Sequence, residues 1–354
     1  MPKRTIALLL GSLLLLVIVL SFIGFDSILE TVENVNLNYL IAAFMMQALA
    51  YLTWNFKWEL ILRNFKEIGF RRSFLPFLAS VFVSDITPGT RVGGDPVRAY
   101  YVSKTGNISG TYSTLSVVID ITTNTGVFLV LLFFSCIFGV LFFNIPSFIK
   151  IPIEIILILI GAAIVSGFLI KRRIPSTSGE FNGALFSLAS KILPKIYYFH
   201  LLKIIRNKFK QYSNFEQYII DRLVKFFDGF FIILKNKKVM LRDIMLAFII
   251  NLLFYVRTYF LFIGLGYDIG FLSLVVVSTI AVTISYFFLI PAGLGVMELV
   301  MITLYVGVGV SAPLAAAVSV LERFIHYSIS LTAGWGAFTY LGLKYGKMKK
   351  KEKL

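Results

Sequence analysis

The sequence is poor in the residues that build disulfides, metal sites and common catalytic centres. It has one cysteine, Cys136, and two histidines, His200 and His326. A single cysteine allows no disulfide within the chain, and the chain has no spaced set of cysteines and histidines that would bind zinc. An Asp-rich metal motif, a nucleophile elbow and a phosphate-binding glycine loop are also missing. We therefore expect no metal and no cofactor.

Charged residues are scarce as well. They make up 15% of the chain, whereas hydrophobic residues make up 58% and the mean hydropathy is +0.86. Soluble domains are about 45–50% apolar, so this composition indicates an integral membrane protein. The longest stretch outside the apolar runs, residues 171–240, is too apolar and basic to resemble a soluble catalytic domain.

Acidic residues are outnumbered, with 18 against 34 lysines and arginines and a net charge of +16. The basic residues gather beside the apolar runs, as the positive-inside rule produces. We therefore expect no nucleic-acid partner and a preference for anionic lipid surfaces. Both termini are predicted to be cytosolic, in a multi-pass protein of the plasma membrane.

The apolar runs predict an all-α polytopic helical bundle. Lys3 and Arg4 precede the first run, which we interpret as an uncleaved anchoring helix followed by an acidic loop. The predicted spans are about Thr5–Ile23, Leu37–Ile61, Gly110–Phe143, Ile153–Ile170, Leu241–Phe262 and Pro313–Leu343. The second run is followed by a basic flank, which consists of Lys57, Arg63, Lys66, Arg71 and Arg72.

Residues 171–240 carry fourteen lysines or arginines and four acidic residues, interleaved with aromatic and aliphatic residues. This pattern is typical of amphipathic helices on the cytosolic leaflet. The same pattern would also fit helices packed against the base of the protein itself. The Lys-rich tail 344–354 follows the last span.

A charged, glycine- and proline-rich segment, Pro88–Lys104, interrupts the first half of the chain. The preceding apolar piece, Ser73–Ile86, has about 14 residues, or about 21 Å of helix, which is too short to cross a bilayer. Non-helical backbone at membrane depth must be buried in protein or line a cavity. We therefore predict a broken re-entrant hairpin that enters from the cytosolic side.

A second break, Pro291–Glu298, lies between the short apolar pieces Phe271–Ile290 and Val296–Gly309. Counting membrane crossings places this second re-entrant hairpin on the outer side. Asp120 follows Pro88 by 32 residues and Glu322 follows Pro291 by 31. Both acids lie about ten residues into their spans, or about 15 Å of helix, which places them near the midplane. We therefore predict an inverted-topology repeat with halves 1–150 and 151–345, as in many transporters.

At these breaks the sequence resembles the lysylphosphatidylglycerol synthase transmembrane-region family, whose members are also described as flippase-like. The matching pieces are Pro88-Gly89, Gly94-Asp-Pro-Val-Arg98, Pro291-Ala-Gly-Leu-Gly-Val-Met-Glu298 and Leu321-Glu-Arg-Phe-Ile-His-Tyr327. Asp95 stands where we expect Glu, and Met297 stands where a basic residue is common.

The resemblance covers nearly the whole chain and implies one flippase-like transmembrane domain. In well-known members that domain translocates an aminoacylated phospholipid made by a fused synthase domain. This chain stops at Leu354, so we expect no lipid synthesis by the chain itself. Links of other members to glycolipid and polyprenyl-phosphate pathways leave the cargo open.

Two sets of residues are candidates for function. The expected substrate-binding residues line the breaks: Arg91, Gly94, Asp95, Arg98, Tyr101, Gly293, Gly295 and Glu298. Among them, Arg98 could bind phosphate, and Asp95 and Glu298 could hold a cationic headgroup, a proton or Arg98 itself. The intramembrane charge set is Asp120, Arg257, Glu322, Arg323 and Tyr327, in which we expect the two acids to pair with Arg257 and Arg323.

The main functional hypothesis is a lipid translocase, with a polar groove between the hairpins for an anionic phospholipid or a lipid-linked glycan or phosphate. One alternative is a membrane enzyme on lipid-linked phosphate or sugar, using Asp95, Asp120 or Glu298 as acid or base. Another is a scaffold on which residues 171–240 dock a soluble lipid-modifying enzyme. The sequence specifies no oligomeric state.

Overall fold

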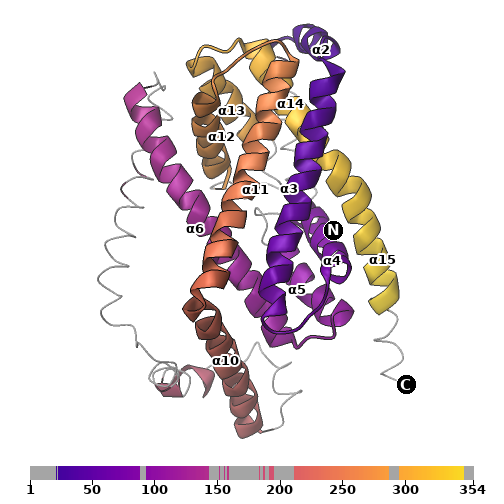
Figure 1. The fold of residues 1–354 in the computed structure, drawn as a ribbon, viewed down its shortest axis with the longest axis vertical. Helices are drawn as coiled ribbons and strands as arrows, with labels where there is room; N and C mark the ends of the chain where they lie inside the picture. The colour runs from indigo at the N-terminus through magenta and orange to yellow at the C-terminus, as the bar shows by residue number, and fades with distance from the viewer. Residues whose placement is uncertain are drawn as a thin grey trace.

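The fold is described by a computed structural model over residues 21, 23–87, 93–142, 211–286 and 295–346, together with isolated positions between 151 and 194. The regular elements in these ranges are helices (Figure 1). They are α2 (Phe25–Glu33), α3 (Leu37–Arg63), α4 (Phe70–Ile86), α5 (Gly94–Thr105), α6 (Gly110–Phe142), α10 (Tyr212–Lys235), α11 (Lys237–Gly264), α12 (Phe271–Tyr286), α13 (Val296–Gly307), α14 (Ala312–Ile329), the π-helical turn η3 (Ser330–Gly334) and α15 (Trp335–Gly346).

Four helical stretches are long and apolar enough to cross a membrane: Leu37–Arg63, Gly110–Phe142, Lys237–Gly264 and Ala312–Tyr345. The prediction of an all-α polytopic membrane protein is therefore confirmed. The predicted spans Thr5–Ile23 and Ile153–Ile170 lie outside the described residues, apart from isolated positions in each.

Helices α3 and α11 form the centre of the bundle and run side by side (Figure 1). The backbone N–H of Asn36, just before α3, donates to the carbonyl of Gly264, the last residue of α11, at 2.8 Å. The start of one helix therefore meets the end of the other, and the two are antiparallel. A Cβ on Gly264 would lie 2.9 Å from Cβ of Tyr39, so this close approach requires glycine.

Helices α4 and α5 are 17 and 12 residues long and pack on each other. A Cβ added to Gly94 would lie 2.1 Å from the carbonyl oxygen of Ser80, so the two backbones touch here. Helices α12 and α13, of 16 and 12 residues, form a second packed pair. The breaks within both pairs, residues 88–92 and 287–294, lie outside the described residues.

The prediction of an acidic loop after the first span is wrong, because Phe25–Glu33 is the helix α2. The acidic residues there alternate with Phe25, Ile28, Leu29 and Val32 at helical spacing. Ile28 is buried, and Val32 packs against the same core beside α14. Asp26 and Glu30 remain on the outer face of this helix.

Helix α10 belongs to the predicted amphipathic segment 171–240. Its Ile233 is buried in a core cluster with Ile61 of α3 and Leu115 of α6, against which Phe226 and Phe230 also pack. Part of this segment therefore packs against the base of the protein. Ile232 and Leu234 remain exposed on the other side of the helix.

Candidate functional site

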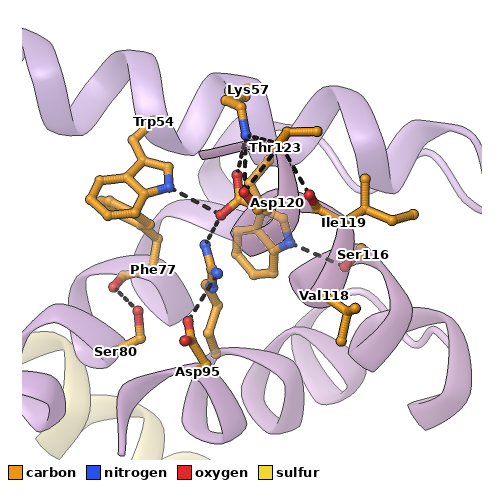
Figure 2. A network of polar contacts seen from close by, with 12 residues as sticks. Trp54, Lys57, Phe77, Ser80, Asp95, Ser116, Val118, Ile119, Asp120 and Thr123 are labelled. Atoms are coloured by element: carbon orange, nitrogen blue, oxygen red, sulfur yellow. Dashed lines mark hydrogen bonds and ion pairs between the residues drawn. The ribbon is translucent and has the colours of Figure 1, made fainter. Parts of the chain in front are cut away.

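Asp120 lies fully buried in α6, and its carboxylate accepts hydrogen bonds from three side chains on two other helices. Lys57 Nζ of α3 donates to Asp120 Oδ1 at 2.8 Å, and Arg98 Nη1 of α5 donates to Oδ2 at 2.8 Å. Trp54 Nε1, one turn before Lys57, donates to Oδ2 at 3.0 Å (Figure 2). This carboxylate thus ties α3, α5 and α6 together.

Arg98 is 2% exposed and connects Asp120 with the start of α5. Its Nη2 donates to Asp95 Oδ1 at 3.0 Å, and its guanidinium lies 4.8 Å from the ring centre of Trp58. Both terminal nitrogens therefore have protein partners, while Nε has none among the described residues. Asp95 and Arg98, two predicted substrate-binding residues, thus form one pair.

The assignment of Lys57 to the basic flank of the second span is wrong. Its side chain is fully buried, because α3 continues to Arg63 and its Lys57 face packs against α6 and α11. Besides Asp120, Lys57 donates to Thr123 Oγ1 at 2.9 Å. It also lies 3.3 Å from a carboxylate oxygen of Asp243 in α11.

Glu298 lies in the first turn of α13, where the second predicted break ends, and is 1% exposed. Gly295, with a φ of 80°, donates its backbone N–H to Glu298 Oε2 at 2.6 Å. Arg323 of α14 donates through Nε to Glu298 Oε1. In contrast, Arg323 Nη2 and the hydroxyl of Tyr327, one turn further along α14, are buried near each other, and neither meets a hydrogen-bond partner of normal geometry among the described residues.

Glu322, next to Arg323, faces the central helices. It accepts hydrogen bonds from Arg257 and Thr258 of α11. Arg257 also donates to Gln47 of α3. The expected pairing of Glu322 with Arg257 is therefore present, whereas Asp120 pairs with Lys57 and Arg98, and Arg323 pairs with Glu298.

A further polar cluster joins α4 to the last helices. His326 Nε2 lies 3.0 Å from Asp85 Oδ2, and Tyr51 Oη lies 2.9 Å from His326 Nδ1. Ser330 also donates to Asp85. Sequence reasoning did not identify this cluster, although Asp85 directly precedes the first break and His326 lies in a quoted family motif.

The remaining predicted site residues fall in three places. Gly94 lies at the close approach of α4 and α5, and Tyr101 packs edge-on against Phe338 of α15. Arg91 and Gly293 lie outside the described residues. The Asp95–Arg98 pair joins Asp120 of α6, whereas Glu298 pairs with Arg323 of α14. The described part of the chain holds no group of three histidine, cysteine or acidic side chains suited to a metal ion.

Comparison with known proteins gives full-length relatives. A UPF0104 membrane protein of Methanocaldococcus jannaschii is 26% identical over 99% of this chain and 98% of its own. One from Methanothermobacter thermautotrophicus is 26% identical over 96% of both chains, and one from Pyrococcus horikoshii is 22% identical over 94% and 95%. No solved structure matches significantly. The family described as the lysylphosphatidylglycerol synthase TM region matches residues 5–334, and the chain belongs to this family.

Proposed function

We propose that this membrane protein is a lipid translocase that moves an anionic phospholipid or a lipid-linked phosphate or glycan across the plasma membrane. The family is named for the membrane region of a lipid synthase, which supports a lipid cargo. The helices of the pairs α4–α5 and α12–α13 are short, and the sequence between the two helices of each pair is rich in glycine and proline. Both features support a polar route through the bundle.

The observation that carries the proposal is the pair of buried donors, at Arg323 and Tyr327, that no acceptor in the described part of the chain satisfies. Buried polar groups nearly always have partners, and a cation within a membrane helix marks a functional position by default. Because Glu298 takes Nε, Nη2 of the Arg323 guanidinium remains for a ligand. A lipid phosphate offers several acceptor oxygens and a negative charge, which suits an arginine and a hydroxyl together.

Arg98 is less available for this role, since Asp95 and Asp120 take both of its terminal nitrogens. We therefore propose Arg323 and Tyr327 as the first phosphate contacts, with Glu298 orienting Arg323. Asp95 and Arg98 would form the second half of the route. A headgroup would reach the shielded donors when α13 and α14 separate.

We further propose that the two halves are inverted repeats. Antiparallel α3 and α11 support this, because each supplies one cation, Lys57 or Arg257, to an acid on a long helix of its own half. The acids are Asp120 of α6 and Glu322 of α14. Exchange of such halves would give inward-open and outward-open states of similar energy.

The test is lipid scrambling in proteoliposomes loaded with a fluorescent anionic phospholipid, with a polyprenyl phosphate as a second cargo. Wild type should expose inner-leaflet lipid to an external quencher, and Arg323→Gln should reduce the rate about tenfold or more, as expected for loss of a charged hydrogen bond. Arg222→Gln, which removes an exposed arginine of α10, should behave as wild type.

Equal rates for wild type, Arg323→Gln and empty liposomes with both cargoes would contradict the proposal. Chemical turnover of the polyprenyl phosphate would instead favour the membrane enzyme. Co-purification of a soluble lipid-modifying enzyme that is lost on deletion of residues 171–210 would favour the scaffold.

A further inference from the structure

We propose that Asp243 of α11 is a reversible proton-binding site. Its side chain is 4% exposed, and among the described residues neither carboxylate oxygen receives a hydrogen bond of normal geometry. The proton binding does not depend on the proposed function, whereas its use in driving lipid movement does.

The two buried carboxylates near Lys57 differ in the hydrogen bonds and ion pairs that they receive. Asp120 receives hydrogen bonds from Lys57, Arg98 and Trp54. Asp243 has an ion pair with the same Lys57, at 3.3 Å against 2.8 Å for Asp120, and the Thr123 hydroxyl beside it. An ionised carboxylate with few donors is costly to bury, and a proton removes that cost. Asp243 is therefore the acid of this cluster that gains most from protonation.

The surroundings allow a proton to arrive from water. A cavity of about 10 Å³, close to the smallest volume that holds one water molecule, lies against Lys57, Arg242 and Asp243. Arg242 is exposed, so the cavity lies between the carboxylate and the surface at the start of α11. That end also carries Lys237 and Lys238, which the positive-inside rule assigns to the cytosol.

The charged and polar groups that face Asp243 come from α3, α6 and α11 itself. Lys57 faces it from α3, Asp120 and the hydroxyl of Thr123 face it from α6, and Arg242 lies across the cavity. Helix α12 has no charged residue. Arg257, which pairs with Glu322 of α14, lies about 21 Å further along α11.

Protonation would change how the central helices are held. With Asp243 ionised, Lys57 links α11 to α3 and α6. With Asp243 neutral, Asp120 is the remaining carboxylate that pairs with Lys57. The proton moves from cavity water to a carboxylate oxygen and returns by the same route, so no other reactant is needed. Cytosolic pH would thereby control the attachment of α11 to α3.

The experiment is pH-difference infrared spectroscopy of the whole protein in detergent, which requires no lipid cargo. Between about pH 8.5 and pH 5.5, above the range in which an ordinary aspartate titrates, wild type should gain a carboxylic-acid C=O band as the pH falls. Asp243→Asn, nearly equal in shape, should lose that band. Asp221→Asn, which removes an exposed carboxylate of α10, should keep it.

A second variant tests the same site if Asp243→Asn does not fold. Lys57→Gln removes the cation that favours ionised Asp243, so the band should appear at higher pH than in wild type. An Asp243→Asn spectrum identical to wild type, or a midpoint unchanged by Lys57→Gln, would overturn the proposal. Because lipid scrambling is measured separately, a protein that scrambles lipid without this band refutes the proton site alone.

Discussion

Lys57 and Asp120, 63 positions apart in the sequence, form an ion pair of 2.8 Å in which both side chains are fully buried. Burying two charges is offset only when each keeps its partner. The pair therefore holds α3 to α6 as long as it is intact, and either charge alone weakens the bundle.

Replacing Asp120 should be strongly destabilising. Asp120→Ala leaves Lys57 and Arg98 buried with fewer partners, and breaking a buried pair costs about 3–5 kcal/mol. Thermal unfolding in detergent, followed by circular dichroism, should show a clearly lower midpoint. Asp221→Ala, at an exposed position, is the control, and equal midpoints for the two variants would contradict this role of Asp120.

The contact between α4 and α5 should tolerate no side chain at Gly94. In Gly94→Ala the new methyl group meets the Ser80 carbonyl at 2.1 Å, so the helices must separate, at a cost of about 1–3 kcal/mol or more. Gly126→Ala in α6 is the matched control, because a Cβ there has nothing within 4 Å. Loss of stability in both variants alike would argue against the close approach.

Glu298 and Arg323 should be energetically coupled. Glu298→Ala leaves Arg323 without its acceptor and removes the cap at Gly295, whereas the double variant also removes the stranded cation. We expect a coupling of about 1–3 kcal/mol in a double-mutant cycle of unfolding free energies. Additive effects would indicate that this contact contributes nothing to folding.

The C-terminal end of α3 and the C-terminal end of α11 should face opposite sides of the membrane. In a Cys136→Ser background, single cysteines at Lys66 and Asp268 should react with an impermeant maleimide from opposite sides of intact cells and inverted vesicles. Lys66 is expected to be cytosolic and Asp268 external. Labelling of both positions from one side would contradict the predicted orientation.

The helices were largely predictable from the sequence because long apolar runs and glycine–proline breaks are strong local signals. Observed α6 and α13 begin where the runs do, at Gly110 and Val296. The partners of the buried charges were not predictable in the same way. Helix α3 is apolar on all sides, so no periodicity indicated that Lys57 is buried rather than part of the basic flank.

The other site residues that were not predicted from the sequence are paired with residues far away along the chain. Asp243 lies next to Arg242 near a basic stretch and resembles an ordinary surface acid in the sequence. Only the packing of α11 on α3 and α6 brings it to Lys57. Likewise, Asp85 and His326 are 241 positions apart. The sequence indicated which residues carry charge, and tertiary packing decides which of them meet.

The π-helical turn Ser330–Gly334 has a consequence for the last long helix. One additional residue in a π turn rotates everything beyond it by about 100° relative to an uninterrupted α-helix. Helix α14 can thus direct Glu322 and Arg323 toward α11 and α13, while α15 directs Phe338 toward Tyr101. Deleting one residue from this turn would therefore turn all of α15 away from its present neighbours.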